Sequence, residues 1–223
     1  MYSKDALEPN TTVDQIIRWQ AGLDGGVKGT DLGYRSMCRL WSGRLQHMSF
    51  LNEFEYYLRM DDDSLFLSDF KWDPFRRMQT EGLTYAYRRV VSDSWGIDEL
   101  WKVSRRHIDL ERNNLPFAHR RFDNESYSYK GEQPYNNFHI SNLKFWKSRR
   151  WTNLMNEMDN HHLFFKYRVG DANVHAISIM MMEENAVGFW KKTPYAHNTN
   201  DYDDGWGQQR WQDECDAAIR DSK

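Results

Sequence analysis

Three consecutive aspartates, Asp61, Asp62 and Asp63, directly follow an aromatic stretch at residues 54–60. That stretch has the composition of a β-strand, so the aspartates are predicted to lie on the turn where the strand ends. Asp61 and Asp63 stand two positions apart, and at such a turn both carboxylates can face one divalent ion, with the oxygen ligands that Mg²⁺ and Mn²⁺ prefer. The alternative is a solvated acidic turn that binds no ion.

A second group of polar residues lies at residues 170–175, where a loop is predicted to lead into a helix with a strongly apolar face. Asp171 stands near the start of that helix, where a carboxylate can cap free backbone N–H groups instead of taking part in chemistry. His175 is either an ordinary buried histidine or an imidazole ligand for the same metal as the aspartates.

Tyr34 and Arg39 form a third pair, in the predicted helix 34–44. Their side chains can hold a phosphate or a base. The alternative is a tyrosine at the edge of the core beside a solvent-facing arginine.

The elements that must position these residues alternate between strand-like and helix-like segments. The alternation predicts an α/β fold with a mixed sheet flanked by helices. The predicted strands are 54–60, 65–67, 83–91, 138–140 and 186–190. The predicted helices are 12–20, 34–44, 73–80, 97–112, 146–160 and 171–183. We predict a loose entry segment at 1–33, one domain at 34–199 with a polar loop at 113–134, and a polar tail at 200–223.

The composition excludes several classes of protein. A net charge of −3 and a pI near 6.2 supply no overall basic field for a nucleic-acid backbone. Two distant cysteines, Cys38 and Cys215, make neither a disulfide framework nor a zinc site. No apolar run approaches the ~18 residues of a membrane span, so we expect a soluble chain as given. P-loop, dinucleotide and nucleophile-elbow motifs are missing from the sequence.

Five segments, taken in order along the chain, resemble glycosyltransferase family 15, the fungal α-1,2-mannosyltransferases that use GDP-mannose. The last, Tyr-Arg-Val-Gly-Asp-Ala-Asn-Val-His, is close to the family's Arg-Trp-Gly-Asp-Ala-Pro-Val-His. The resemblance implies a GT-A-like fold, although the family's first strand has no visible counterpart before residue 34, so that a sheet edge would be left open. The segments are 34–39, 54–63, 83–87, 135–140 and 167–175.

What the resemblance implies is a retaining enzyme that moves mannose from GDP-mannose to a sugar hydroxyl of a glycan or glycoprotein, with Mn²⁺ or Mg²⁺ bridging the diphosphate. Asp61 then stands where the family has a metal-binding glutamate, and His175 where it has a metal-binding histidine. Tyr34 stands at a donor-contacting tyrosine, and Asp171 lines the acceptor side. Our preferred hypothesis adds Arg39, which with Tyr34 would hold the donor phosphates or base. Family members are usually type II membrane proteins of the Golgi lumen.

One departure from the family concerns the catalytic position at residue 139. The family has a glutamate there, proposed as nucleophile, and this chain has His139, which cannot form the glycosyl ester that a carboxylate forms. Four explanations stay open: same-face attack with the leaving phosphate as base, another carboxylate as nucleophile, a different donor chemistry, or loss of activity. The two main hypotheses are therefore an active hexosyltransferase and an inactive carbohydrate-binding relative of the same fold. A metal-dependent phosphodiesterase is a weaker third. The aromatic residues considered as acceptor platforms are Trp95, Trp101, Tyr127 and Tyr129.

Overall fold

The computed structural model describes residues 8–22, 32–111, 115–120, 127–191 and 193–197. The predicted entry segment 1–33 therefore lies only partly within the described residues. The predicted tail 200–223 and Cys215 lie outside them.

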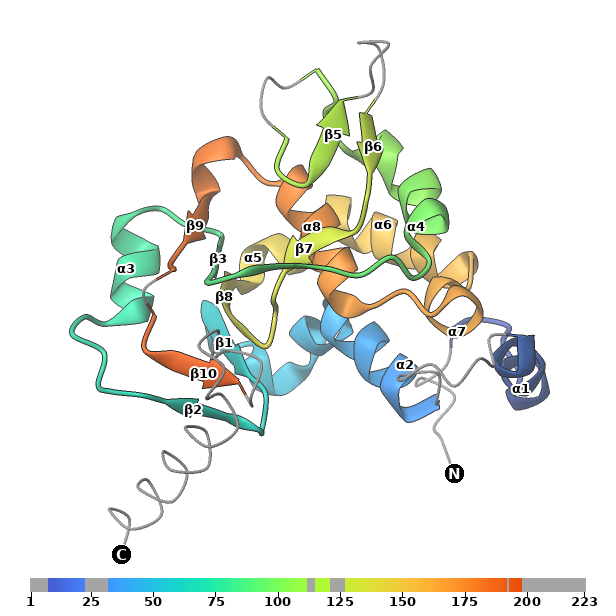
Figure 1. Cartoon of the computed structure of the whole chain (residues 1–223), viewed down its shortest axis with the longest axis horizontal. Helices are drawn as coiled ribbons and strands as arrows, with labels where there is room; N and C mark the ends of the chain where they lie inside the picture. The colour runs from blue at the N-terminus through green and yellow to red at the C-terminus, as the bar shows by residue number, and fades with distance from the viewer. Residues whose placement is uncertain (1–7, 23–31, 112–114, 121–126, 192, 198–223) are drawn as a thin grey trace, which may run out of the picture.

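A four-stranded mixed sheet forms the centre of the fold (Figure 1), with strands in the order β1-β8-β3-β9. Strand β8 pairs antiparallel with both β1 and β3, and β3 pairs parallel with β9. The predicted mixed sheet flanked by helices is confirmed. The four strands are β1 (Tyr56–Met60), β3 (Tyr85–Tyr87), β8 (Phe138–Asn142) and β9 (Val187–Phe189).

Strand β1 lies at an edge of this sheet, because β8 is its only strand partner among the described residues. Its side chains alternate: Tyr57 and Arg59 are buried, whereas Met60 at the end of the strand is exposed. The buried face of β1 therefore includes a positively charged side chain, that of Arg59, two residues before Asp61.

Within the described residues, three two-stranded sheets surround the central one. The segment 113–134, for which we predicted a loop, holds both strands of one of these sheets and one strand of another. That prediction was wrong, because strands of three residues are too short to show a period in the sequence. The predicted strand 83–91 is likewise two strands, since β3 and β4 pair with different partners. The pairs are β2 (Ser64–Phe66) with β10 (Tyr195–His197), β4 (Val90–Ser92) with β7 (Glu132–Pro134), and β5 (Ala118–Arg120) with β6 (Tyr127–Tyr129).

Every helix predicted from the sequence is present, several of them shorter than expected. The predicted helix 34–44 breaks after residue 39 and continues as short helical turns, among them η2 (Leu40–Arg44). The break contains Gly43, at φ +140, where a Cβ would stand 2.4 Å from the indole nitrogen of Trp151. The helices are α1 (Val13–Gly22), α2 (Leu32–Arg39), α3 (Pro74–Thr80), α4 (Ile97–Ser104), α5 (Leu143–Trp146), α6 (Arg149–Asn160), α7 (Leu163–Tyr167) and α8 (Asp171–Met181).

Helix α8 runs through the middle of the core and is buried on nearly all sides. Its neighbours in the same apolar cluster include Trp146 and Trp151. A helix that is apolar all round is expected to be enclosed by other elements. Because Asp171 and His175 both lie on α8, each must find its polar partners inside the protein.

Within the described residues, no helix combines the length and the apolar character needed to cross a membrane.

Candidate metal centre

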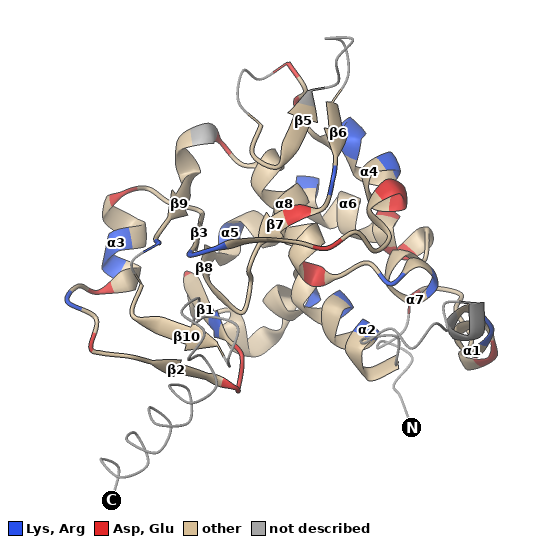
Figure 2. Cartoon of the chain, viewed as in Figure 1, with Lys and Arg blue, Asp and Glu red and all other residues tan. Residues whose placement is uncertain are grey.

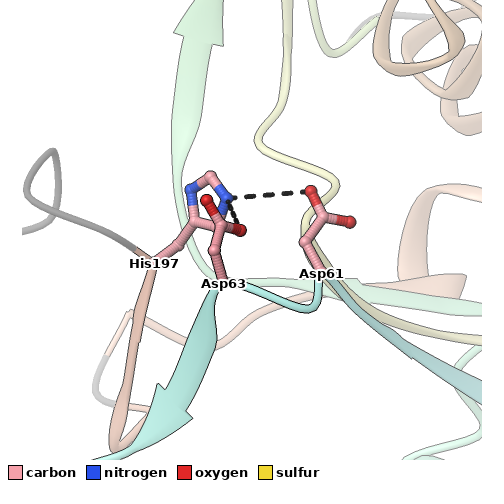
Figure 3. A group of neighbouring side chains, drawn as sticks. All are labelled: Asp61, Asp63 and His197. Atoms are coloured by element: carbon pink, nitrogen blue, oxygen red, sulfur yellow. Dashed lines mark ion pairs between the residues drawn. The ribbon is translucent and has the colours of Figure 1, made fainter. Parts of the chain in front are cut away.

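Three side chains with metal-binding atoms meet at the end of β1. The carboxylates of Asp61 and Asp63 and the imidazole of His197 lie with one ligand atom each within 4.8 Å of one another. Figure 3 shows the two aspartates and the histidine turned toward one another, with His197 Nε2 2.7 Å from Asp63 Oδ1 and 3.8 Å from Asp61 Oδ2. We call these three residues the carboxylate–histidine group.

Strand pairing brings these residues together. Asp61 follows the last residue of β1, and its N–H donates to the carbonyl oxygen of Asn137 at 3.2 Å. In the pairing of β2 with β10, Ser64 stands opposite His197, which places the imidazole beside Asp63. Figure 2 shows the acidic turn in red at the junction of β1 and β2, with blue on β1 itself.

The ring of His197 is oriented by a second contact. Its Nδ1 lies 2.6 Å from the hydroxyl of Tyr135, which is the kind of partner that fixes the orientation of a metal-binding histidine. The side chain of His197 is only 12% exposed, whereas those of Asp61 and Asp63 are 32% and 52% exposed. Two carboxylates and one oriented imidazole on a partly open surface suit Mn²⁺, which accepts oxygen and imidazole ligands.

His175 is not a member of this group. Its ring is fully buried on α8, with Nδ1 2.8 Å from the hydroxyl of Tyr85 and Nε2 3.1 Å from the carbonyl oxygen of Trp41. A carbonyl oxygen only accepts, so Nε2 carries the proton and Nδ1 accepts from Tyr85. The expectation that His175 would meet Asp61 and Asp63 is therefore corrected: both of its nitrogens have partners within the protein, and the imidazole beside the aspartates is that of His197.

His139 is also fully buried. Its Nδ1 lies 2.9 Å from the carbonyl oxygen of Asn136 and its Nε2 3.0 Å from the hydroxyl of Tyr57. The same reasoning places the proton on Nδ1. Burial, together with the nearby His175 and Arg59, holds the pKa of His139 well below its usual range, so the ring is neutral. This neutral, enclosed imidazole has both nitrogens bonded within the protein. A catalytic role at the position of His139 stays a prediction.

Asp171 lies at the first position of α8, but its carboxylate does not cap that helix. It accepts from Arg59 Nη1 and from Asn136 Nδ2, the latter at 2.8 Å. Burial alone would raise the pKa of Asp171, but the charge of Arg59, the nearby His175 and the two hydrogen bonds lower it overall, so the group is ionised. At 5% exposure this carboxylate faces the protein, so the expectation that it lines an acceptor site is not met in this structure.

The Arg39 side chain joins α2 to α6. Its Nε and Nη2 donate to the two carboxylate oxygens of Asp159 at 2.9 and 2.8 Å, and Asp159 is fully buried. The half-buried Tyr34 lies earlier on the same helix α2, and the guanidinium of Arg168 stands 5.2 Å from the Tyr34 ring. Neither side chain touches the carboxylate–histidine group in these contacts, so contact of Tyr34 and Arg39 with a donor stays a prediction.

The four aromatic residues considered as acceptor platforms contact other protein groups. Trp101 and Tyr127 pack against the main core, and Tyr129 is buried with its hydroxyl donating to Asn173 at 2.5 Å. The Arg168 guanidinium lies 5.5 Å from the ring of Trp95. Core packing therefore accounts for Trp101, Tyr127 and Tyr129.

Residues 18–219 match the sequence profile of the glycolipid 2-alpha-mannosyltransferase family. The chain belongs to this family. The resemblance identified from the motifs is thereby confirmed.

Among curated members of the family, the chain is 28% identical over 182 residues to O-glycoside alpha-1,2-mannosyltransferase homolog 3 of Schizosaccharomyces pombe, an alignment that covers 78% of this chain and 48% of the relative. It is 29% identical over 189 residues to glycolipid 2-alpha-mannosyltransferase 1 of Candida albicans, covering 82% and 43%. The chain thus spans about half the length of the curated relatives it matches.

Two solved structures in the family have the same fold. Core-mannan synthase A from Aspergillus fumigatus, in its Mn/GDP form, superposes with a TM-score of 0.75 at 22% identity, covering 88% of this chain and 57% of that one. The mannosyltransferase Ktr4p from Saccharomyces cerevisiae, in complex with GDP, superposes with a TM-score of 0.72 at 18% identity, covering 88% and 54%. These similarities confirm the α/β architecture expected of a GT-A-like transferase.

His197 is the one member of the carboxylate–histidine group that the sequence analysis missed. The only local signal was its place at the end of a three-residue strand, β10, and so short a strand has no recognisable pattern. Its position beside Asp63 follows from the pairing of β10 with β2, across more than a hundred residues.

Proposed function

We propose that this chain is the metal-binding part of a hexosyltransferase that moves mannose from GDP-mannose to a sugar hydroxyl of a glycan or glycoprotein. Family membership and the names of the relatives support the transfer of mannose. The observation that carries the proposal for this chain is the carboxylate–histidine group, which has the donor set and openness of a divalent-cation site.

In the proposed site, Asp61, Asp63 and His197 hold Mn²⁺ or Mg²⁺. When bound, the cation neutralises the diphosphate that leaves with the nucleoside. Tyr135 keeps the imidazole turned toward the carboxylates through its hydrogen bond to His197 Nδ1. Asn137 fixes the start of the acidic turn through its carbonyl oxygen.

The buried states of His139 and Asp171 bear on how the sugar is transferred. His139 is neutral and enclosed, and Asp171 is bonded to Arg59 and Asn136, so neither is placed as a nucleophile. We therefore infer same-face attack. The acceptor oxygen forms its bond to the anomeric carbon while the bond to the diphosphate breaks, and the acceptor proton passes to the departing phosphate. Such a route retains the configuration without a glycosyl ester.

Calorimetric titration with GDP in the presence and absence of Mn²⁺ tests the proposal. We expect binding by the wild-type chain to depend on Mn²⁺, and we expect Asp61→Ala and His197→Ala each to weaken it about tenfold or more, since each removes a proposed metal ligand. The matched control is His175→Gln, which replaces the buried histidine outside the group and should retain metal-dependent binding. Binding that ignores Mn²⁺, or that survives both ligand substitutions, would refute the metal site.

The second candidate function is a carbohydrate-binding relative without turnover, and His139 in place of the family's glutamate favours it. The release of GDP from GDP-mannose, measured with and without a mannoside acceptor, separates the two functions. Acceptor-dependent release supports the transferase. Metal-dependent binding of GDP without any release supports the binding protein.

A further inference from the structure

Arg59 is a buried cation on β1, two residues before Asp61. Its Nε and Nη2 each lie 3.1 Å from Asp61 Oδ1. The other oxygen of the same carboxylate, Oδ2, is the one that lies toward His197 Nε2. The guanidinium therefore occupies one oxygen of Asp61 and leaves the opposite oxygen directed into the carboxylate–histidine group.

The guanidinium is itself held by two further elements. Its Nη1 donates to Asp171 Oδ2 on α8, and its central carbon lies 4.4 Å from the centre of the Trp41 ring in η2. The Asp171 carboxylate in turn accepts from Asn136. Because Arg59 is only 5% exposed and is contacted by three elements, it has little freedom to move.

The charge of Asp171 explains how the positively charged Arg59 can lie beside Asp61, a proposed metal ligand. A positive charge next to Asp61 would by itself oppose the binding of a second cation. The ionised Asp171 lies against the same guanidinium and offsets its charge. The pair of Arg59 and Asp171 is thus nearly neutral as a unit, so it can hold the Asp61 carboxylate in place without a large repulsive field on the ion.

We propose that Arg59 is a positioning residue that orients Asp61 as a cation ligand, and that Asp171 is the anchor of Arg59. The proposal rests on the proposed function, because it presumes that the carboxylate–histidine group binds a divalent ion. In this proposal Asp171 acts on the ion indirectly, through Arg59 and then Asp61. The role of Arg59 requires the planar, forked guanidinium of arginine. A lysine has one compact ammonium and cannot bond Asp61 and Asp171 with the same geometry.

The test measures the Mn²⁺ dissociation constant by electron paramagnetic resonance, with no nucleotide present. We expect Arg59→Lys to weaken Mn²⁺ binding about 10- to 100-fold, the range seen when groups that orient metal ligands are replaced. Replacing Arg59 by a neutral residue alone would leave Asp171 as an unpaired buried charge, and the variant could then fail to fold. The double variant Arg59→Gln with Asp171→Asn avoids this with two neutral amides, and we expect the same loss of affinity from it.

A double-mutant cycle shows whether Arg59 acts through Asp61. In the Asp61→Asn background, Arg59→Lys should change the dissociation constant by less than about twofold, because the carboxylate it orients is already gone. Equal effects of Arg59→Lys in both backgrounds would overturn the proposal.

Arg39→Lys is the matched control, since Arg39 is another buried arginine that bonds an aspartate, Asp159, through two nitrogens. It should lower thermal stability and leave Mn²⁺ affinity unchanged. The positioning role alone would be overturned if folded Arg59→Lys bound Mn²⁺ with wild-type affinity. It would also be overturned if the Arg39 and Arg59 variants lost the same amount of Mn²⁺ affinity. A wild-type chain that does not bind Mn²⁺ would overturn the metal centre and the positioning role together.

Discussion

At the scale of single residues, the two buried histidines form a small polar cluster inside an aromatic core. The rings of His139 and His175 lie 4.8 Å apart between centroids, and each accepts from one tyrosine and donates to one backbone carbonyl. Burial lowers the pKa of His175 to about 4, although Asp171 acts in the opposite direction. Both rings therefore stay neutral in the folded chain at neutral pH.

This neutrality predicts a loss of stability in acid. In the unfolded chain a histidine takes up its proton near pH 6.5, whereas folded His175 does so only near pH 4. Between these values the unfolded state binds more protons, so the free energy of unfolding falls as the pH falls, by about 3 kcal/mol in total for His175. Below about pH 4 this contribution no longer changes.

The measurement is urea unfolding at pH 7 and pH 4 for the wild type and for His175→Gln. Glutamine keeps a donor and an acceptor for Trp41 and Tyr85 but has no proton to gain. We expect the wild type to lose about 3 kcal/mol more than the variant across this interval. Equal losses in the two proteins would show that His175 is not the responsible group.

At the scale of elements, a close contact between two backbone segments fixes the start of β7. The backbone at Gly131 precedes β7 with φ +87, and a Cβ at this position would stand 2.1 Å from the carbonyl oxygen of Asp93. The N–H of Asp93 donates to the carbonyl oxygen of Gly131 at 3.0 Å. The two backbone segments therefore lie close together beside the pairing of β4 with β7. Only a residue without a Cβ fits there.

Gly82 offers a matched comparison, with φ +65 and no other atom within 4 Å of the position that a Cβ would take. We expect Gly82→Ala to cost about 1 to 2 kcal/mol from the left-handed backbone alone. Gly131→Ala should cost about 3 kcal/mol or more, because the contact with Asp93 adds to the backbone strain. Thermal unfolding of the two variants checks the order. A Gly131 variant as stable as the Gly82 variant would contradict the close approach.

At the scale of the whole molecule, the carboxylate–histidine group joins parts of the chain that lie far apart in sequence. Asp61 and Asp63 lie at the β1–β2 turn and His197 at the end of β10. An ion bound by all three links these segments in the folded state and has no such site in the unfolded chain.

Mn²⁺ should therefore raise the melting temperature of the chain. An ion that binds only the folded state stabilises it by about 2.7 kcal/mol at a concentration of 100 times its dissociation constant. Differential scanning fluorimetry over a Mn²⁺ series checks this, and EDTA should reverse the shift. Asp63→Ala serves as the control, and a rise in melting temperature that persists undiminished in that variant would place the ion elsewhere.

The sequence by itself determined the mixed α/β class, the family and the acidic turn, because each is recognised from short motifs and local patterns, taken in their order along the chain. The aromatic stretch before Asp61 predicts β1, and the apolar run after Asp171 predicts α8. Local composition and period are sufficient for such elements.

The tertiary structure decided which histidine faces the aspartates. His175 is the last residue of a family-like motif. Because α8 is buried on nearly all sides, the His175 ring forms hydrogen bonds with Tyr85 and Trp41 inside the protein. His197 reaches Asp63 because β10 pairs with β2 in a register that local sequence does not encode. The partners of a side chain depend on the packing of whole elements, and packing is a long-range property of the chain.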